Sequence, residues 1–245
     1  MKYIKLFENF EDYDPYELII LPPNKKTEMI VSEIKKRDKA NLNLVRDLIE
    51  LGANVDWQVE DDSTALHYCA YKNHPEVARI LIEAGADVNI QNLFGETALH
   101  WCASDNRIEL ARMLIEAGAD LNKKNKYDWT VLHYCAFENR IEIAKMLIDA
   151  GADLNSKQSN GWSALHWCAS KNNIEIAKML IDAGADVNIQ DEYNQTSLHV
   201  CATMKRPEIA RMLIDAGADK SIPNRNGVIP YALTINQALK KLLKP

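Results

Sequence analysis

The chain lacks any long hydrophobic run. Among its 245 residues, the longest apolar stretch near the start is Leu18-Ile19-Ile20-Leu21, and a membrane-spanning helix needs about 18 to 20 such residues. Acidic residues from Glu8 onward also interrupt the start before an apolar segment of signal-peptide length can develop. We therefore expect no membrane association and a soluble, intracellular protein, cytoplasmic by default.

The sequence also lacks clusters of basic residues. It has 29 Lys and Arg against 35 Asp and Glu, which gives a formal net charge of −6. Affinity for a nucleic-acid backbone comes mainly from clustered Lys and Arg, so no nucleic-acid partner is expected. No Gly-rich phosphate loop and no paired-carboxylate motif is present. These absences predict a protein that is not an enzyme and has no cofactor or metal.

What the chain does have is a tandem repeat of 33 residues. The tetrapeptide Thr64-Ala65-Leu66-His67 returns in the same or nearly the same form five times in all, and its copies begin at Thr64, Thr97, Thr130, Ser163 and Thr196. Such a fixed period indicates one structural unit copied in tandem. Domain counting by length does not apply to an array of this kind, because its size grows with the number of copies.

A second repeated feature is a glycine that follows an apolar, helix-periodic segment. These glycines are Gly52, Gly85, Gly118, Gly151, Gly184 and Gly217, and the last five each begin a Gly-Ala-Asp tripeptide. A residue in the left-handed conformation commonly ends a helix, and glycine adopts that conformation most easily. Each repeat is therefore predicted to contain a helix that ends at its glycine.

Together these motifs resemble the ankyrin repeat, in which Thr-Pro-Leu-His opens one helix and Gly-Ala-Asp ends the next. The resemblance implies an all-α solenoid of helix-turn-helix units with β-hairpin-like tips. We expect a capping repeat at 27–58, five full repeats at 59–223 and a short capping repeat at 224–245, so that the stack is complete as it stands. Residues 1–26 are acidic and aromatic, and we expect little regular structure in them. They are interpreted as a tail or cap extension, or alternatively as a short docking peptide.

Several repeated residues have structural roles in this interpretation. The motif Thr or Ser is expected to cap the first helix, and the resemblance implies that the motif His bonds the backbone of neighbouring loops. The turn between the two helices holds an Asn, which tolerates left-handed geometry, except in the last full repeat, where Lys205 stands in its place.

The cysteines also repeat, each two residues after a motif His, at Cys69, Cys102, Cys135, Cys168 and Cys201. Stacked helices lie about 8 to 10 Å apart, whereas a disulfide needs Cα atoms within about 7 Å. Residues i and i+2 of a helix point ~200° apart, so His and Cys of one motif cannot share an ion or a proton. We predict buried, packed thiols. The alternative is a thiol-dependent enzyme that uses one Cys with a His of a neighbouring repeat.

The resemblance implies that a protein partner binds the concave face and the hairpin tips. Aromatic residues gather there, at positions expected to be exposed, and our predicted partner-binding residues are Phe94, Tyr127, Trp129, Phe137, Trp162 and Tyr193. Four of the motif histidines are directly followed by an aromatic residue, and this column is interpreted as packing between repeats: Tyr68, Trp101, Tyr134 and Trp167. Two alternatives stay open. Neighbouring tips stack only on one another, or the repeats are a spacer and residues 1–25 bind the partner. The partner's identity is not encoded, and a monomer is expected.

Overall fold

The computed structural model describes residues 15–36 and 40–244, and in those ranges its regular elements are helices, with no strand. The chain divides into two compact units, residues 1–120 and 121–245. The predicted all-α class is confirmed. None of the described helices is long and apolar enough to cross a membrane.

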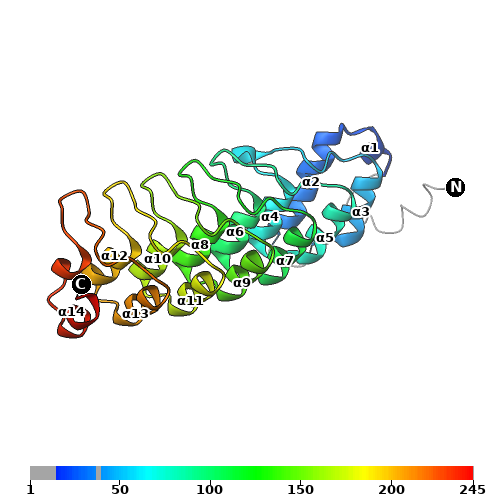
Figure 1. Cartoon of the computed structure of the whole chain (residues 1–245). Helices are drawn as coiled ribbons and strands as arrows, with labels where there is room; N and C mark the ends of the chain where they lie inside the picture. Colours follow the sequence, from blue (N-terminus) through cyan, green and yellow to red (C-terminus); the bar gives the residue numbers. More distant parts are fainter. Residues whose placement is uncertain (1–14, 37–39, 245) are drawn as a thin grey trace. The chain divides into compact units, whose positions relative to one another are not determined.

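The first unit consists of paired helices in two rows. One row contains α2 (Pro23–Lys35), α4 (Ala65–Lys72) and α6 (Ala98–Asp105), and the other contains α3 (Leu42–Glu50), α5 (Pro75–Glu83) and α7 (Ile108–Glu116). Each helix contacts the next one in its row. Long loops leave the helices on one side (Figure 1), and the short 3-10 helix η2 (Glu60–Asp62) lies in one of them.

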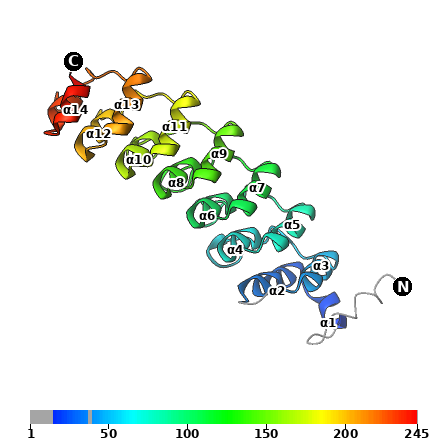
Figure 2. The same cartoon turned by 90° about the horizontal axis from the view of Figure 1, so that it is seen from below.

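The second unit has the same two rows. The first helices are α8 (Val131–Glu138), α10 (Ala164–Lys171) and α12 (Ser197–Met204), and the second helices are α9 (Ile141–Asp149), α11 (Ile174–Asp182) and α13 (Pro207–Asp215). Figure 2 shows the rows side by side. The unit ends with the 3-10 helix η3 (Pro230–Leu233), which stands where a sixth motif would begin, and with α14 (Gln237–Leu243).

The motif residues form the predicted cap. At the start of α10, the Ser163 hydroxyl accepts from the third backbone N–H of the helix, and the Ser163 backbone N–H donates to His166 Nδ1 over 3.2 Å. Because Nδ1 accepts, the imidazole proton is on Nε2, which donates to the carbonyl of Gln195 in the next repeat over 3.1 Å. His67, His133 and His199 make the same kind of bond to the following loop. The structural role predicted for the motif histidines is confirmed.

The inter-helix turns have the expected left-handed backbone. Asn73, Asn106, Asn139 and Asn172 have φ between 58° and 65°, and Lys205 adopts the same conformation with φ 58°. A side chain with a Cβ is strained there, and Asn is strained less than Lys. Lys205 is therefore the turn residue whose chemistry suits its backbone least.

Successive loops are joined by a ladder of side-chain acceptors. In the second unit, an asparagine side chain of one loop accepts a hydrogen bond from the backbone N–H of the Gly-Ala-Asp aspartate in the next loop. The bond is 2.8 Å long in each case and joins Asp153 to Asn122, Asp186 to Asn155 and Asp219 to Asn188. The first unit has matching bonds from Asp87 to Asp56 and from Asp120 to Asn89. Each of these bonds joins a loop to the loop of the next repeat, so neighbouring loops are tied together along the stack within each unit.

The expectation of little regular structure before residue 27 is wrong for the part that is described. Residues Pro15–Ile20 form helix α1, and α2 begins at Pro23. Lys26 explains the order: it is buried, and its ammonium donates to the carbonyls of Ile19 and Leu51 at 3.3 and 2.8 Å. It thereby ties the end of α1 to the end of α3. Residues 1–14 lie outside the described residues, and the division at 26 and 27 stays a prediction.

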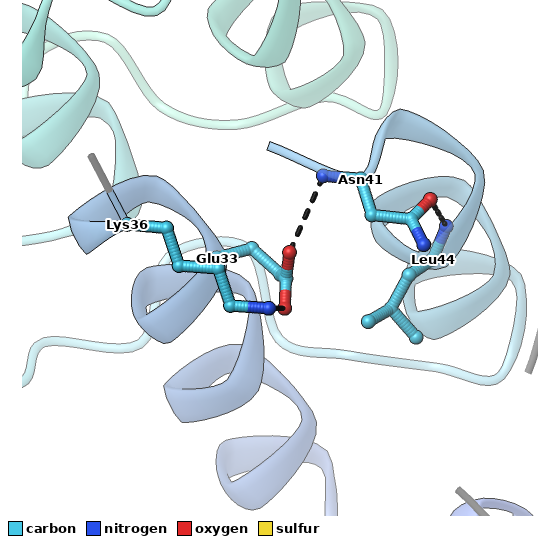
Figure 3. Close-up of polar contacts among 4 residues, drawn as sticks. All are labelled: Glu33, Lys36, Asn41 and Leu44. Atoms are coloured by element: carbon cyan, nitrogen blue, oxygen red, sulfur yellow. Dashed lines mark hydrogen bonds and ion pairs between the residues drawn. The ribbon is translucent and has the colours of Figure 1, made fainter. Parts of the chain in front are cut away.

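In the degenerate first repeat, a buried carboxylate joins the two helices (Figure 3). Glu33 is buried near the end of α2; its Oε2 accepts from the backbone N–H of Asn41 over 3.2 Å, and its Oε1 pairs with Lys36. Asn41 then caps α3, since its Oδ1 accepts from the backbone N–H of Leu44 over 3.1 Å. Glu33 and Asn41 thus link the end of α2 to the start of α3.

Candidate functional site: an aromatic surface of the second unit

The hairpin tip at 125–129 is built around one amide. Asn125 is buried, and its Oδ1 accepts from the backbone N–H groups of Tyr127 and Trp129 at 2.9 and 3.0 Å. Its Nδ2 donates to the Tyr134 hydroxyl over 3.1 Å. A single side chain therefore fixes the turn and one neighbouring ring. Tyr127 is left 66% exposed at the tip, while Trp129 turns toward the helices.

Five rings of the second unit form what we call the aromatic cluster: Trp129, Tyr134, Phe137, Trp162 and Trp167. Trp167 of α10 is at its centre, with ring centroids 5.0 Å from Trp129, 4.9 Å from Phe137 and 4.6 Å from Trp162. Trp129 also lies 5.1 Å from Tyr134 and 5.6 Å from Phe137. The pairs are tilted or edge-to-face, which are the favoured geometries of aromatic contacts.

Trp162 is held in place by the next repeat. Its indole Nε1 donates to Asp191 Oδ2 over 3.0 Å. The other oxygen of this buried carboxylate, Oδ1, accepts from the backbone N–H groups of Tyr193 and Gln195, each over 2.8 Å. Asp191 therefore organises its own turn and orients the preceding tryptophan at the same time.

The predicted binding residues separate into three groups. Trp129, Phe137 and Trp162 come together in the aromatic cluster, where they are half-buried, so the expectation that these positions are exposed is wrong for them. The reason is that the large neighbouring Trp167 gives them rings to pack on. Tyr127 and Tyr193 are exposed at the tips, at 66% and 59%. Phe94 is 47% exposed and belongs to the first unit.

Two members of the aromatic cluster were not among our predicted binding residues. Trp167 and Tyr134 belong to the column interpreted as packing between repeats, and Trp167 does pack on Trp129 and Phe137 of the preceding repeat. The sequence did contain a signal for this cluster, because two neighbouring repeats each have large rings at two positions five residues apart: Trp129 and Tyr134, then Trp162 and Trp167. The alternative of rings that stack only on one another describes this cluster in part, but not the two exposed tyrosines.

The repeated cysteines are buried and not joined in disulfides. Burial raises the pKa of each thiol, to about 12 for Cys201 and further for Cys69, Cys135 and Cys168. Such thiols remain protonated at neutral pH and are poor nucleophiles. Among the described residues, no group of His, Cys, Asp and Glu could hold a metal ion.

The first unit has a pocket that none of our predicted residues lines. It has a volume of 580 Å³ and lies between α2 and the segment 57–60, with Val31, Lys35, Trp57 and Glu60 in its lining. Lys35 pairs with Glu60 at 3.0 Å and lies 4.6 Å from the centre of the Tyr68 ring. The hydrogen bond to Glu60 raises the pKa of Lys35. Lys35 and Glu60 therefore already satisfy each other, and Glu28, which also lines the pocket, pairs with Lys25 at 2.7 Å.

Comparison with known proteins assigns the family. The model described as "Ankyrin repeats (3 copies)" matches residues 84–158 and 132–224, and the model described as "Ankyrin repeat" matches residues 61–93. No curated protein sequence matches the chain. Among solved structures, the ankyrin repeat domain of Bcl-3, a unique member of the IkappaB protein family, is similar, with 25% identity and a TM-score of 0.81. The match covers 92% of this chain and 99% of that one. Ankyrin repeats generally bind proteins, and this chain belongs to the ankyrin repeat family.

Proposed function

We propose that the chain is a non-enzymatic protein-binding module, acting as an adaptor, scaffold or inhibitor. The partner would contact the hairpin tips and first helices of the second unit, which correspond to the concave face of the family. The observation that carries this proposal is the aromatic cluster together with the exposed rings of Tyr127 and Tyr193. The mechanism is occupancy of a surface and involves no chemical step.

The physical argument is that these rings offer area at low entropic cost. Aromatic side chains are enriched at binding hot spots, where they are surrounded by groups that exclude water. Trp162 is already oriented by Asp191, and the Tyr127 backbone by Asn125. Ordering side chains on association costs free energy, so rings that are fixed beforehand bind more tightly. Phe94, which belongs to the first unit, is proposed separately as a partner contact.

The cysteines support a non-enzymatic role. Their raised pKa and their burial disfavour the thiol-dependent alternative. Unpaired thiols also suit a reducing compartment, so the proposal includes an intracellular location. We also propose that the protein is a monomer.

Quantitative affinity purification from the native cell tests the proposal. The variant to compare with the wild type is Tyr127→Ala/Tyr193→Ala, because truncating two exposed rings leaves the packed cluster intact. The matched control is Lys145→Ala/Lys178→Ala, which shortens two exposed side chains of the second helices α9 and α11. All variants are first shown to unfold at the same denaturant concentration.

We expect a protein that is retained by wild type and by the lysine variant and lost from the tyrosine variant. Recovery of the same proteins with both variants would place the binding surface elsewhere. A third variant that lacks residues 1–14 tests the part of the spacer alternative that assigns binding to those residues, and it keeps α1 and the Lys26 contacts. Loss of the partner from this variant alone would mean that the N-terminal segment binds and the repeats are a spacer.

A further inference from the structure

The aromatic cluster borders a pocket that has one charge. It has a volume of 280 Å³ and is lined by Asn125, Tyr127, Trp129, Tyr134, Phe137 and Glu138. The faces of Trp129 and Phe137 meet at 75°, and those of Trp129 and Tyr134 at 59°. Ring faces carry negative potential, and Glu138 is the only charged residue of the lining, so the pocket is complementary to a cation.

The second unit already contains an arginine on the equivalent ring. Tyr193 stands two repeats after Tyr127, at the same position of its hairpin tip, and the Arg225 guanidinium carbon lies 5.5 Å from the centre of the Tyr193 ring. The residue that corresponds to Arg225 beside Tyr127 is Ser159. Ser159 uses its hydroxyl to donate to Asp128 Oδ2 over 2.9 Å and has no cation to offer.

The pocket carboxylate, Glu138, uses one of its two oxygens in its ion pair with Arg140. Glu138 pairs with Arg140 through Oε2 at 3.6 Å, and both side chains are partly exposed. An exposed ion pair of this kind contributes little to stability, so Glu138 can also pair with a second cation. Among the described contacts, Oε1 is not engaged by this pair. A guanidinium is planar, stacks on aromatic faces and matches a carboxylate with two parallel N–H groups, whereas an ammonium is a compact and strongly hydrated charge.

We propose that this pocket binds an arginine side chain of the protein partner, against Tyr127 and Trp129 and with its guanidinium toward Glu138. The inference rests on the proposed function and names the chemistry of the group that would be recognised. The partner's arginine would lie against the Tyr127 ring, as Arg225 lies against the Tyr193 ring. The Lys171 ammonium already lies 3.9 Å from the centre of the Phe137 ring, so the groups left to the partner's arginine are Tyr127, Trp129 and Glu138.

The test is an NMR titration of the full chain with N-acetyl-arginine amide, followed at the indole N–H of Trp129. The matched ligand is N-acetyl-citrulline amide, which has nearly the same shape and no charge. We expect a saturable shift with a dissociation constant of about 1 to 10 mM, as suits so small a ligand. Citrulline should bind about tenfold more weakly, and the Glu138→Gln variant should lower the affinity for arginine about three- to tenfold.

Two further variants use the repeat itself. Ser159→Arg places an arginine beside Tyr127 as Arg225 stands beside Tyr193, and it should block the added ligand. Ser159→Gln also removes the bond to Asp128 but adds no charge, and it should bind as the wild type does. The proposal is overturned if no saturable shift occurs up to ~50 mM ligand, if citrulline binds as well as arginine, or if N-acetyl-trimethyllysine amide binds more tightly than arginine.

The readouts separate this inference from the proposed function. A partner lost from Tyr127→Ala/Tyr193→Ala, together with no arginine binding, would keep the binding module and reject the arginine pocket. Arginine binding at Trp129, together with retention of every partner by the tyrosine variant, would show that the pocket accepts arginine but would reject both the tips as the partner surface and a partner's arginine as the occupant of the pocket.

Discussion

The buried imidazole of His133 is hydrogen-bonded to the main chain of Trp162, with Nε2 3.1 Å from the Trp162 carbonyl oxygen. One repeat therefore holds in place the backbone of a candidate binding residue in the next. His166 makes the same bond to Gln195. Scaffold and candidate surface are thus connected by single hydrogen bonds, whose strength depends on the charge state of the histidine.

This arrangement predicts a loss of stability in mild acid. Burial lowers the pKa of His133 and His166 to about 4, whereas an unfolded histidine has a pKa near 6.5. The unfolded chain therefore binds more protons between these values, and stability is full above about pH 6.5 and falls as the pH drops toward 4. Each histidine contributes a slope of up to about 1.4 kcal/mol per pH unit.

Urea unfolding from pH 7.5 to 5 measures this slope. The comparison is His133→Gln, which removes one of the buried imidazoles and should reduce the slope. The same free energy of unfolding at pH 7.5 and at pH 5 would contradict the prediction.

A second prediction concerns the bond between Trp162 and Asp191. Asp191→Asn should keep its turn, because Asn125 and Asn224 accept two backbone N–H groups in the same way at equivalent positions. The second oxygen becomes an NH₂ group, which cannot accept from the Trp162 indole. We expect the tryptophan emission to change and stability to fall by about 1 kcal/mol.

A double-mutant cycle with Trp162→Phe isolates this bond. In the phenylalanine background, Asp191→Asn should cost almost nothing, because the indole donor has already been removed. An equal cost in both backgrounds would show that Asp191 acts through its own turn alone.

A third prediction concerns the thiols. Buried cysteines with a raised pKa should react with iodoacetamide only when the chain opens, so labelling of the native protein should be slow at all five positions and rapid in urea. Mass spectrometry of timed samples identifies each site. One cysteine that is labelled much faster than the others in the native protein would favour the thiol-dependent enzyme.

A fourth prediction concerns the strained turn at Lys205. Lys205→Gly should stabilise the protein by about 1 kcal/mol, because glycine adopts φ 58° without the clash that a Cβ makes. Lys205→Asn, which copies the other repeats, should give part of this gain. Asn172→Gly is the comparison and should have a smaller effect. A loss of stability in Lys205→Gly would show that the lysine side chain makes a compensating contact.

The fold could be predicted from the sequence because the same helix signals occur in every full repeat. A single Thr-Ala-Leu-His is a weak signal, but five copies with Gly-Ala-Asp in register specify the helices, their ends and the cap. The residues around Lys26 and Glu33 carry no such repetition. Their roles depend on which backbone carbonyl and N–H groups lie near them in the folded chain. For this reason helix α1 and the link that Glu33 makes between α2 and α3 were not anticipated.

The candidate site was predictable only in part. Column analysis found Trp129, Trp162 and Tyr127, because aromatic residues at variable positions are conspicuous. It could not show that Trp129 and Trp162 turn inward onto Trp167, since ring orientation depends on how neighbouring repeats pack. The pocket beside Glu138 also depends on the spatial relation of a tip and a helix end.

The ladder of loop bonds has a consequence for the length of the chain. Asn155 and Asn188 stand at the same place in their repeats, and each accepts from the aspartate that follows in the next. Removing residues 156–188 would join Asn155 to Ile189 and give Asp219 an unchanged acceptor, with one helix pair fewer. The gene could thus grow or shrink by whole repeats without a new kind of junction.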